Sequence, residues 1–97
     1  MSHYIALVHG DDGNFGVSFP DFPGCITVSP DLQDCPRRAA EVLAFHAAGM
    51  IEDGLEIPKP RTLPSVLADP DWGDDARAAL SIFVPLILPF PESSKSS

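Results

Sequence analysis

The chain has 97 residues, of which 44% are hydrophobic and 21% are charged, and these proportions are those of one small globular domain. Fourteen acidic against six basic residues give a formal net charge of −8, which argues against a nucleic-acid surface because such a surface needs clustered Lys and Arg. No apolar run approaches the ~20 residues needed to span a bilayer, and no secretory signal is evident. We therefore expect a cytoplasmic protein. Its acidity suits a basic protein partner, although acidity that only keeps a cytosolic protein soluble is the commoner case.

The first half of the chain predicts three antiparallel strands in a meander. Residues 3–9 are rich in β-forming side chains, and a Gly- and Asp-rich loop follows them. After the loop, apolar and small side chains alternate along residues 15–19. Residues 20–24 hold two prolines and cannot extend a central strand, whereas residues 25–28 predict a short third strand. His3 and His9 fall on one face of the first strand, which we expect to meet solvent.

One long helix is expected after these strands. Asp34 is favoured over Asp31 as its N-cap, because Pro36 is tolerated only within the first helical turn. Gly54 is expected to end the helix, and the prolines that follow prevent it from resuming. Apolar residues recur at helical spacing on one face, which should therefore lie on the sheet. They are Leu32, Cys35, Ala39, Val42, Leu43, His46, Ala47 and Met50.

The last third of the chain carries weaker signals. Residues 63–67 allow one short turn of helix, and residues 68–75, with four aspartates, are expected to form a surface loop. Residues 81–88 predict a fourth strand, which Pro85 restricts to a sheet edge or forces into a bulge. Residues 90–97 are rich in Pro and Ser and are expected to be a disordered tail, so the folded domain spans residues 1–89. The prediction is an α+β fold, an antiparallel sheet of three to four strands (β-β-β-α-β) with one long helix packed on one face.

No pattern in the sequence predicts catalysis, a cofactor or a metal site. Asp11 and Asp12 fall at one end of the second strand and Asp21 at the other, which a rise of ~3.3 Å per residue separates by more than about 10 Å. These three carboxylates therefore cannot hold one metal ion together. Cys25 and Cys35 could form a disulfide by number alone, but buried free thiols are expected.

Phe45 is a candidate for contact with a protein partner. It falls on the polar side of the predicted helix, near Arg38 and Glu41, and exposed aromatic side chains recur at protein interfaces. A lone exposed ring is also common and needs no functional explanation. Both interpretations of Phe45 stay open on the sequence alone.

Two segments together resemble the HicB antitoxin family. Residues 19–25 (FPDFPGC) follow the second predicted strand as an F-P-D-x-P-G-C-type turn does in that family. Residues 52–60 (EDGLEIPKP) close the predicted helix in the family's E-D-G-x-x-I-P-x-P pattern. The two segments occur in the family's order and about thirty residues apart. The resemblance runs from about residue 4 to residue 63, and more loosely to residues 82–88.

The resemblance implies a partial ribonuclease-H-like domain without catalytic carboxylates, which binds and neutralises HicA, a small basic toxin that cleaves messenger RNA. Complete family members usually append a helix-turn-helix or ribbon-helix-helix segment that binds operator DNA, and this chain stops where that segment would begin. We therefore expect a non-enzymatic antitoxin, a ribonuclease inhibitor that does not bind DNA by itself and that forms homo-oligomers through its strand edges. The candidate partner-binding residues are Asp11, Asp12, Asp21, Phe22 and Phe45.

Two other functions remain open. The domain could be a stand-alone HicB-like interaction module with no toxin partner, which the absence of a small basic protein in the neighbouring reading frame would favour. It could also be a residual ribonuclease-H-type hydrolase, which would need two or more carboxylates converging at the sheet to hold a divalent ion. The sequence predicts no such convergence.

Overall fold

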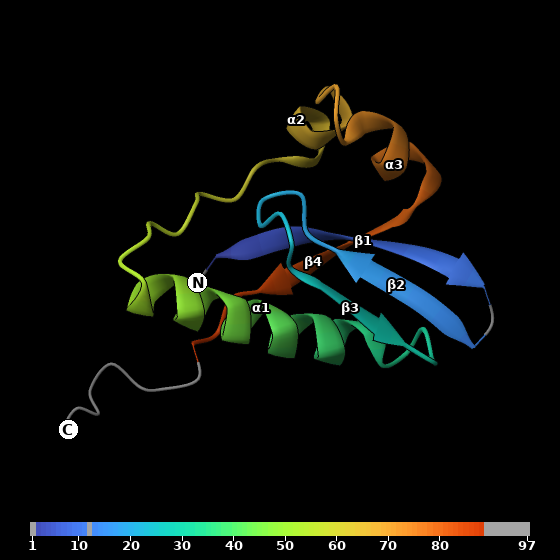
Figure 1. Cartoon of the computed structure of the whole chain (residues 1–97). Helices are drawn as coiled ribbons and strands as arrows, with labels where there is room; N and C mark the ends of the chain where they lie inside the picture. The colour runs from blue at the N-terminus through green and yellow to red at the C-terminus, as the bar shows by residue number, and fades with distance from the viewer. Residues whose placement is uncertain (1, 12, 89–97) are drawn as a thin grey trace.

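Four antiparallel strands form one sheet in residues 2–11 and 13–88, the part of the chain that the computed structural model describes (Figure 1). The strands are β1 (His3–Asp11), β2 (Asn14–Ser18), β3 (Ile26–Ser29) and β4 (Leu80–Pro85), in the spatial order β3-β2-β1-β4. The helices are α1 (Cys35–Glu52), α2 (Leu63–Leu67) and α3 (Gly73–Ala78). The predicted α+β class and antiparallel sheet are confirmed.

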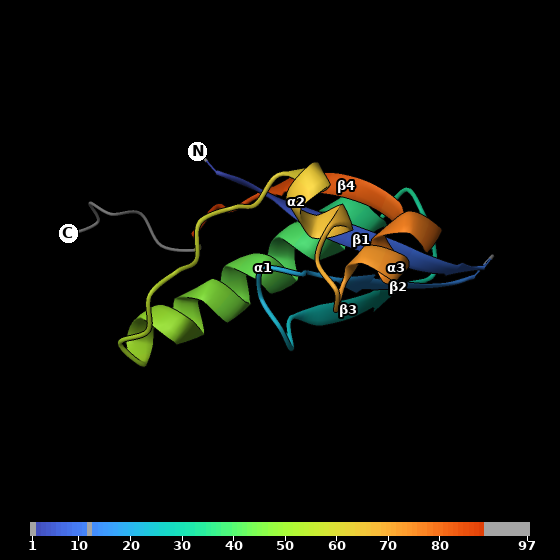
Figure 2. The same cartoon turned by 90° about the horizontal axis from the view of Figure 1, so that it is seen from above.

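Helix α1 crosses one face of the sheet diagonally and builds the main core (Figures 1 and 2). Its buried residues are spaced by four, as expected for the narrow stripe of a helix that lies on a flat surface, and they are Cys35, Ala39, Leu43 and Ala47. The first three of them pack in one cluster with the alternate residues of β1 that share this face, Tyr4, Ala6 and Val8. The predicted stripe is confirmed at its centre. Leu32 is exposed, contrary to prediction, because it lies in the turn before the helix.

Helices α2 and α3 cover the opposite face (Figures 1 and 2). The sequence predicted the short helical turn at residues 63–67, which is α2, but not α3 and not the cover that the two helices give to this face. Ile5 and Leu7 of β1 point to this side and form a second small core with residues of α2 and α3. The expectation that the face of β1 with His3 and His9 meets solvent is therefore wrong at the centre of the strand. Its N-terminal end, at His3, is exposed. Residues 4–8 are buried without interruption, which is typical of a strand covered on both sides.

Two boundaries in the last third differ from the prediction. Helix α3 begins at Gly73, inside the stretch expected to be a loop, and carries Asp74 and Asp75 in its first turn, where acidic groups favour a helix. Strand β4 begins at Leu80 and ends at Pro85, three residues before the predicted end, because proline has no N–H to donate. It lies at the sheet edge, as that proline requires. The predicted tail, residues 90–97, lies outside the described residues.

Candidate protein-binding surface

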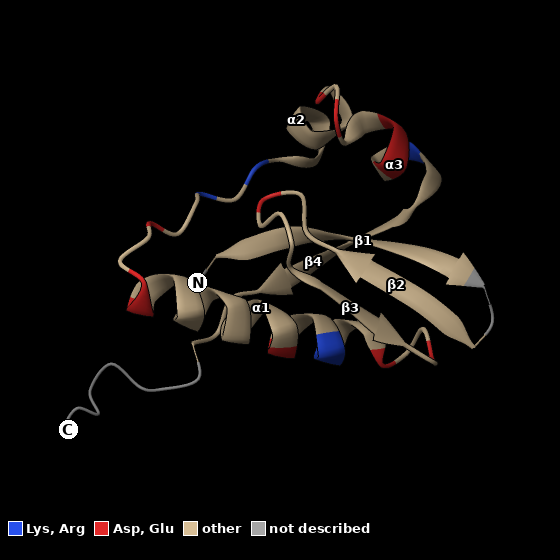
Figure 3. Ribbon diagram, viewed as in Figure 1, with Lys and Arg blue, Asp and Glu red and all other residues tan. Residues whose placement is uncertain are grey.

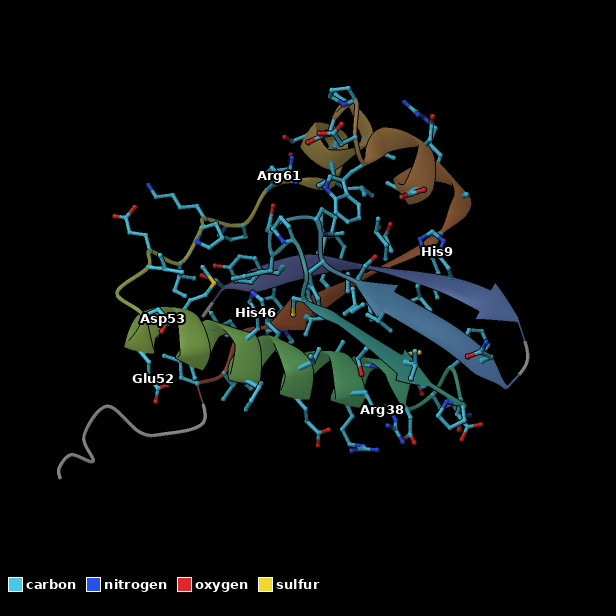
Figure 4. All side chains as sticks on the ribbon, viewed as in Figure 1. His9, Arg38, His46, Glu52, Asp53 and Arg61 are labelled. Atoms are coloured by element: carbon cyan, nitrogen blue, oxygen red, sulfur yellow. The ribbon has the colours of Figure 1, made fainter. Side chains whose placement is uncertain are left out.

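Asp21 is the buried member of a partly buried ion-pair network. Its carboxylate is 3% exposed and accepts hydrogen bonds from Arg61 Nε at 2.6 Å and from the Arg61 backbone N–H at 3.0 Å. Arg61 also donates to Asp69 at 2.7 Å, so the network ties the turn after β2 to the segment around α2 (Figure 4). These hydrogen bonds raise the pKa of Arg61 and lower the pKa of Asp69. Asp21, a candidate partner-binding residue from the sequence, is therefore buried in this structure, where its carboxylate holds two segments of the fold together.

Phe22 fills the main core between the sheet and α1. It is 1% exposed, and its ring packs edge-to-face against Tyr4 at a centroid distance of 4.9 Å and against His46 at 5.9 Å. The turn that places it is closed by the Cys25 N–H, which donates to the Phe22 carbonyl at 2.9 Å. Gly24 has the φ of +89° that the third position of a type II turn requires. Phe22 therefore lies too deep to reach a partner in this conformation.

The β1–β2 hairpin tip lies at the end of the sheet remote from the C-terminal end of α1 (Figure 1). Of the two acids predicted there, Asp12 falls outside the described residues. Asp11 ends the ladder, where it pairs with Asn14. The tip is therefore separate from the surface around Phe45, and Asp21 belongs to neither region.

Phe45 is 81% exposed on α1, which confirms the predicted position on the polar side of the helix. It borders a groove of about 340 Å³ along the C-terminal half of α1, the Phe45 groove. The groove is lined by Phe45, His46, Gly49, Met50, Asp53 and Leu55. Exposed apolar rings are typical of interfaces when other apolar side chains adjoin them, and here Leu55 is also exposed.

The end of α1 builds the far wall of this groove. The N–H of Gly54, at a φ of +76°, donates to the Ile51 carbonyl at 3.0 Å, and the N–H of Leu55 donates to the Met50 carbonyl at 2.9 Å. This pair of bonds is the Schellman motif that ends many helices. It turns the chain back, so that Leu55 flanks the helix instead of extending beyond it. The sequence predicted the stop at Gly54 but not the groove that the reversal creates.

Acidic side chains gather at the same end of α1 (Figures 3 and 4). Glu52, Asp53 and Glu56 form no ion pair within residues 2–11 and 13–88. Most of the described arginines are already engaged in ion pairs, which Arg37 forms with Asp34 and Glu41, Arg61 with Asp21 and Asp69, and Arg77 with Asp74. Asp53 lines the groove itself, and Glu52 and Glu56 lie beside it in the chain, so this end of the groove is negative.

The described side chains include two buried thiols and no cluster of metal ligands. Over residues 2–11 and 13–88, no three His, Cys, Asp or Glu side chains gather closely enough to hold a metal ion. Cys25 and Cys35 are buried free thiols, as predicted. Burial raises the pKa of the Cys25 thiol to about 11, which keeps it protonated and unreactive. In the described part of the chain no helix is both long and apolar enough for a membrane span.

Comparisons with known proteins identify the family. Residues 4–89 match the model described as HicB_like antitoxin of bacterial toxin-antitoxin system. Over 74 residues the chain is 34% identical to the "Uncharacterized 14.9 kDa protein in rep-hol intergenic region" of Haemophilus phage HP1 (strain HP1c1). That alignment covers 76% of this chain and 55% of the phage protein, so the chain spans about half the length of this relative.

Solved structures share the fold. The antitoxin HicB of Burkholderia pseudomallei superposes with a TM-score of 0.72 at 27% identity, over 91% of this chain and 65% of that one. A chain of the HicA3 and HicB3 toxin-antitoxin complex superposes with a TM-score of 0.69 at 22% identity, over 88% of this chain and 98% of that one. The sheet, its covering helices and the family match define a HicB-type domain. The chain belongs to the HicB-like antitoxin family.

Proposed function

We propose that this chain is the antitoxin that binds and neutralises a HicA-type toxin, a small basic protein that cleaves messenger RNA. The observation that carries the proposal is the family match over residues 4–89. The HicA3 and HicB3 complex supports the class of partner, because a chain of this fold occurs in it. In this proposal the chain is a cytoplasmic, non-catalytic inhibitor that occludes the surface with which the toxin binds RNA.

The charge of the chain supports the same partner. A formal net charge of −8 attracts a basic protein and repels the phosphates of nucleic acid. Complementary potential speeds the encounter of two proteins more than it tightens the final complex. The acids of the hairpin tip, Asp11 and Asp12, remain proposed contributors to this steering, and Phe45 remains a proposed contact. Asp21 and Phe22 contribute indirectly, through the fold.

Co-expression in bacteria tests the proposal. The small basic protein encoded beside this gene is induced alone and then together with this chain. The expected result is growth arrest by the first and recovery with the second. A matched control is Leu43→Asp, which places an unpaired charge in the main core and should abolish the rescue. If the wild-type chain gives no rescue against any neighbouring basic protein, the domain is a stand-alone interaction module instead.

A further inference from the structure

Gly49 is a weak point in α1 that the fold does not require. Glycine in the interior of a helix is destabilising relative to alanine, because it loses more backbone freedom on folding. A Cβ placed at Gly49 would meet no atom within 4 Å outside the helix backbone, so no close packing explains the glycine. The open space above it is the floor of the Phe45 groove. The missing side chain thus leaves room in the groove for a group from another molecule.

The charges at the end of α1 are a second unfavourable feature. The C-terminus of a helix carries partial negative charge, which basic side chains relieve and acidic ones worsen. The last turn of α1 holds no basic residue, and Glu52 and Asp53 occupy its end, with Glu56 just beyond. A cation supplied by a partner would be attracted both by these carboxylates and by the helix end.

The exposed apolar side chains are a third unfavourable feature in the same place. Phe45 is 81% exposed, and Leu55 is 56% exposed on the other side of the groove. Burying such surfaces on binding releases water and is the main favourable term in protein association. Three costs to the free chain therefore coincide over one groove. A single occupant with apolar and cationic groups would offset the charge and the exposed apolar surface, and the space left by Gly49 would admit it.

We propose that the Phe45 groove is the docking site for an amphipathic basic segment of the toxin partner. An apolar side chain of that segment enters above Gly49, between Phe45 and Leu55, and its neighbouring Lys or Arg side chains pair with the acids at the end of α1. This inference rests on the proposed antitoxin function and deepens it by assigning the surface. A volume of about 340 Å³ suits an anchoring side chain or a short segment.

Charge complementarity favours a basic partner over a second copy of this chain. Three of the five basic residues in the described part are already held in ion pairs, namely Arg37, Arg61 and Arg77. A second copy would therefore bring mainly its own acids to the groove, against a net charge of −8 on each chain. Like charges placed face to face across an interface oppose association.

The first test fills the groove with one variant and removes an apolar side chain from its border with another, and neither change touches the core. Gly49→Leu places a side chain into open space and should block the groove, and Phe45→Ala removes an exposed ring. Each should weaken binding of the small basic protein encoded beside this gene by about tenfold or more in calorimetry, with an unchanged or raised melting temperature. The matched control is Phe83→Ala, a 59% exposed ring that β4 presents on the other face of the sheet, paired with Ile5. This control should bind as the wild type does.

The second test compares two variants that have the same net charge but lose their acids at different places. The groove variant Glu52→Gln/Asp53→Asn/Glu56→Gln is compared with Asp31→Asn/Asp71→Asn/Asp75→Asn, which neutralises three exposed acids elsewhere. The groove variant should associate with the same partner at least about threefold more slowly at low salt, and the difference should shrink at high salt. Its melting temperature should not fall, because acids at a helix C-terminus oppose the helix dipole. Equal slowing by both variants would show that only total charge matters and would overturn the docking site.

A direct readout locates the partner. The chain has two methionines, and Met50 lines the groove, so its ¹³C-labelled methyl group reports contact there. Its resonance should shift on formation of the complex and should stay unshifted when Gly49→Leu is mixed with the same partner. A complex with an unshifted Met50 methyl, or one that Gly49→Leu and Phe45→Ala form with wild-type affinity, overturns this inference and leaves the antitoxin function standing. No complex with the wild-type chain overturns both.

Discussion

At the scale of single residues, the Asp21 carboxylate fixes the segment around α2 to the turn after β2. Asp21→Asn removes the charge that Arg61 and its backbone N–H both contact. We expect the free energy of unfolding to fall by about 1–3 kcal/mol, the usual cost of leaving a buried polar group poorly paired. Urea denaturation measures the change, with exposed Asp71→Asn as the control. Equal midpoints for the two variants would show that the Arg61 contact contributes nothing.

Asp69 gives the same network a dependence on pH. The hydrogen bond from Arg61 lowers the pKa of Asp69 below its ordinary value of 3.8. Since the native pKa is the lower one, the ionised group stabilises the fold above about pH 4, and this contribution is lost as the pH falls through the native pKa. Asp69→Asn should therefore have a lower melting temperature than the wild type at pH 7. The difference between the two melting temperatures should shrink below about pH 4. Thermal unfolding at a series of pH values checks this, and a constant gap would contradict it.

Gly24 holds the turn that places Phe22 in the core. Its φ of +89° is a conformation that a β-branched side chain rarely adopts. Gly24→Val should therefore cost about 1–3 kcal/mol through backbone strain, although nothing lies within 4 Å of a Cβ at that position. Chemical denaturation measures the cost, and Gly49→Ala, at a helical glycine, should instead stabilise. If Gly24→Val unfolds at the same denaturant concentration as the wild type, backbone strain at this turn is negligible.

At the scale of elements, the sequence predicts the parts whose signals are local. The proline-limited start and the Gly54 stop of α1 depend on residues within one turn of each boundary, and both are confirmed. Helix α3 was missed because an aspartate-rich stretch is typical of loops, although Asp74 and Arg77 stand three apart and pair at 3.2 Å. The burial of both faces of β1 was missed because it depends on α2 and α3, which lie more than fifty residues away along the chain.

The candidate site also combines features that the sequence predicts with features that it does not. The exposure of Phe45 follows from helical periodicity and was predictable. The burial of Asp21 was not, because its partner Arg61 lies forty residues along the chain. The Phe45 groove needs the reversal at Gly54 that brings Leu55 beside the helix. The Asp21–Arg61 contact joins segments distant in sequence and leaves no periodic pattern to detect. The groove was missed for another reason, because a predicted helix stop does not give the direction in which the chain reverses.

Strand β4 makes the edge of the sheet a candidate for self-association. It pairs with β1 on one side only, and Leu80 and Phe83 are more than half exposed on its two faces. An unpaired edge with apolar side chains favours pairing with a second copy. We expect a dimer or higher oligomer by light scattering at tens of micromolar protein. Leu80→Lys should shift the population toward monomer, and a wild-type chain that is strictly monomeric would contradict the expectation.

At the scale of the whole molecule, charge and shape support one kind of partner. Most of the described arginines form internal ion pairs, so acids dominate the remaining charge of the chain, which suits the proposed basic partner. The two cores hold the sheet between α1 and the α2–α3 pair. The Phe45 groove lies at the C-terminal end of α1. The proposed function asks of this surface only affinity for a partner, whose RNA-binding surface the chain would then cover.

The most direct test of this account is inhibition of the purified toxin. The small basic protein encoded beside this gene is incubated with RNA, and cleavage is followed while the chain is added in increasing amounts. The account predicts that cleavage falls to zero at a fixed molar ratio, and that the two proteins elute together in a complex whose association slows as salt rises. Undiminished cleavage at a large excess of folded chain, with no complex formed, would contradict the antitoxin function.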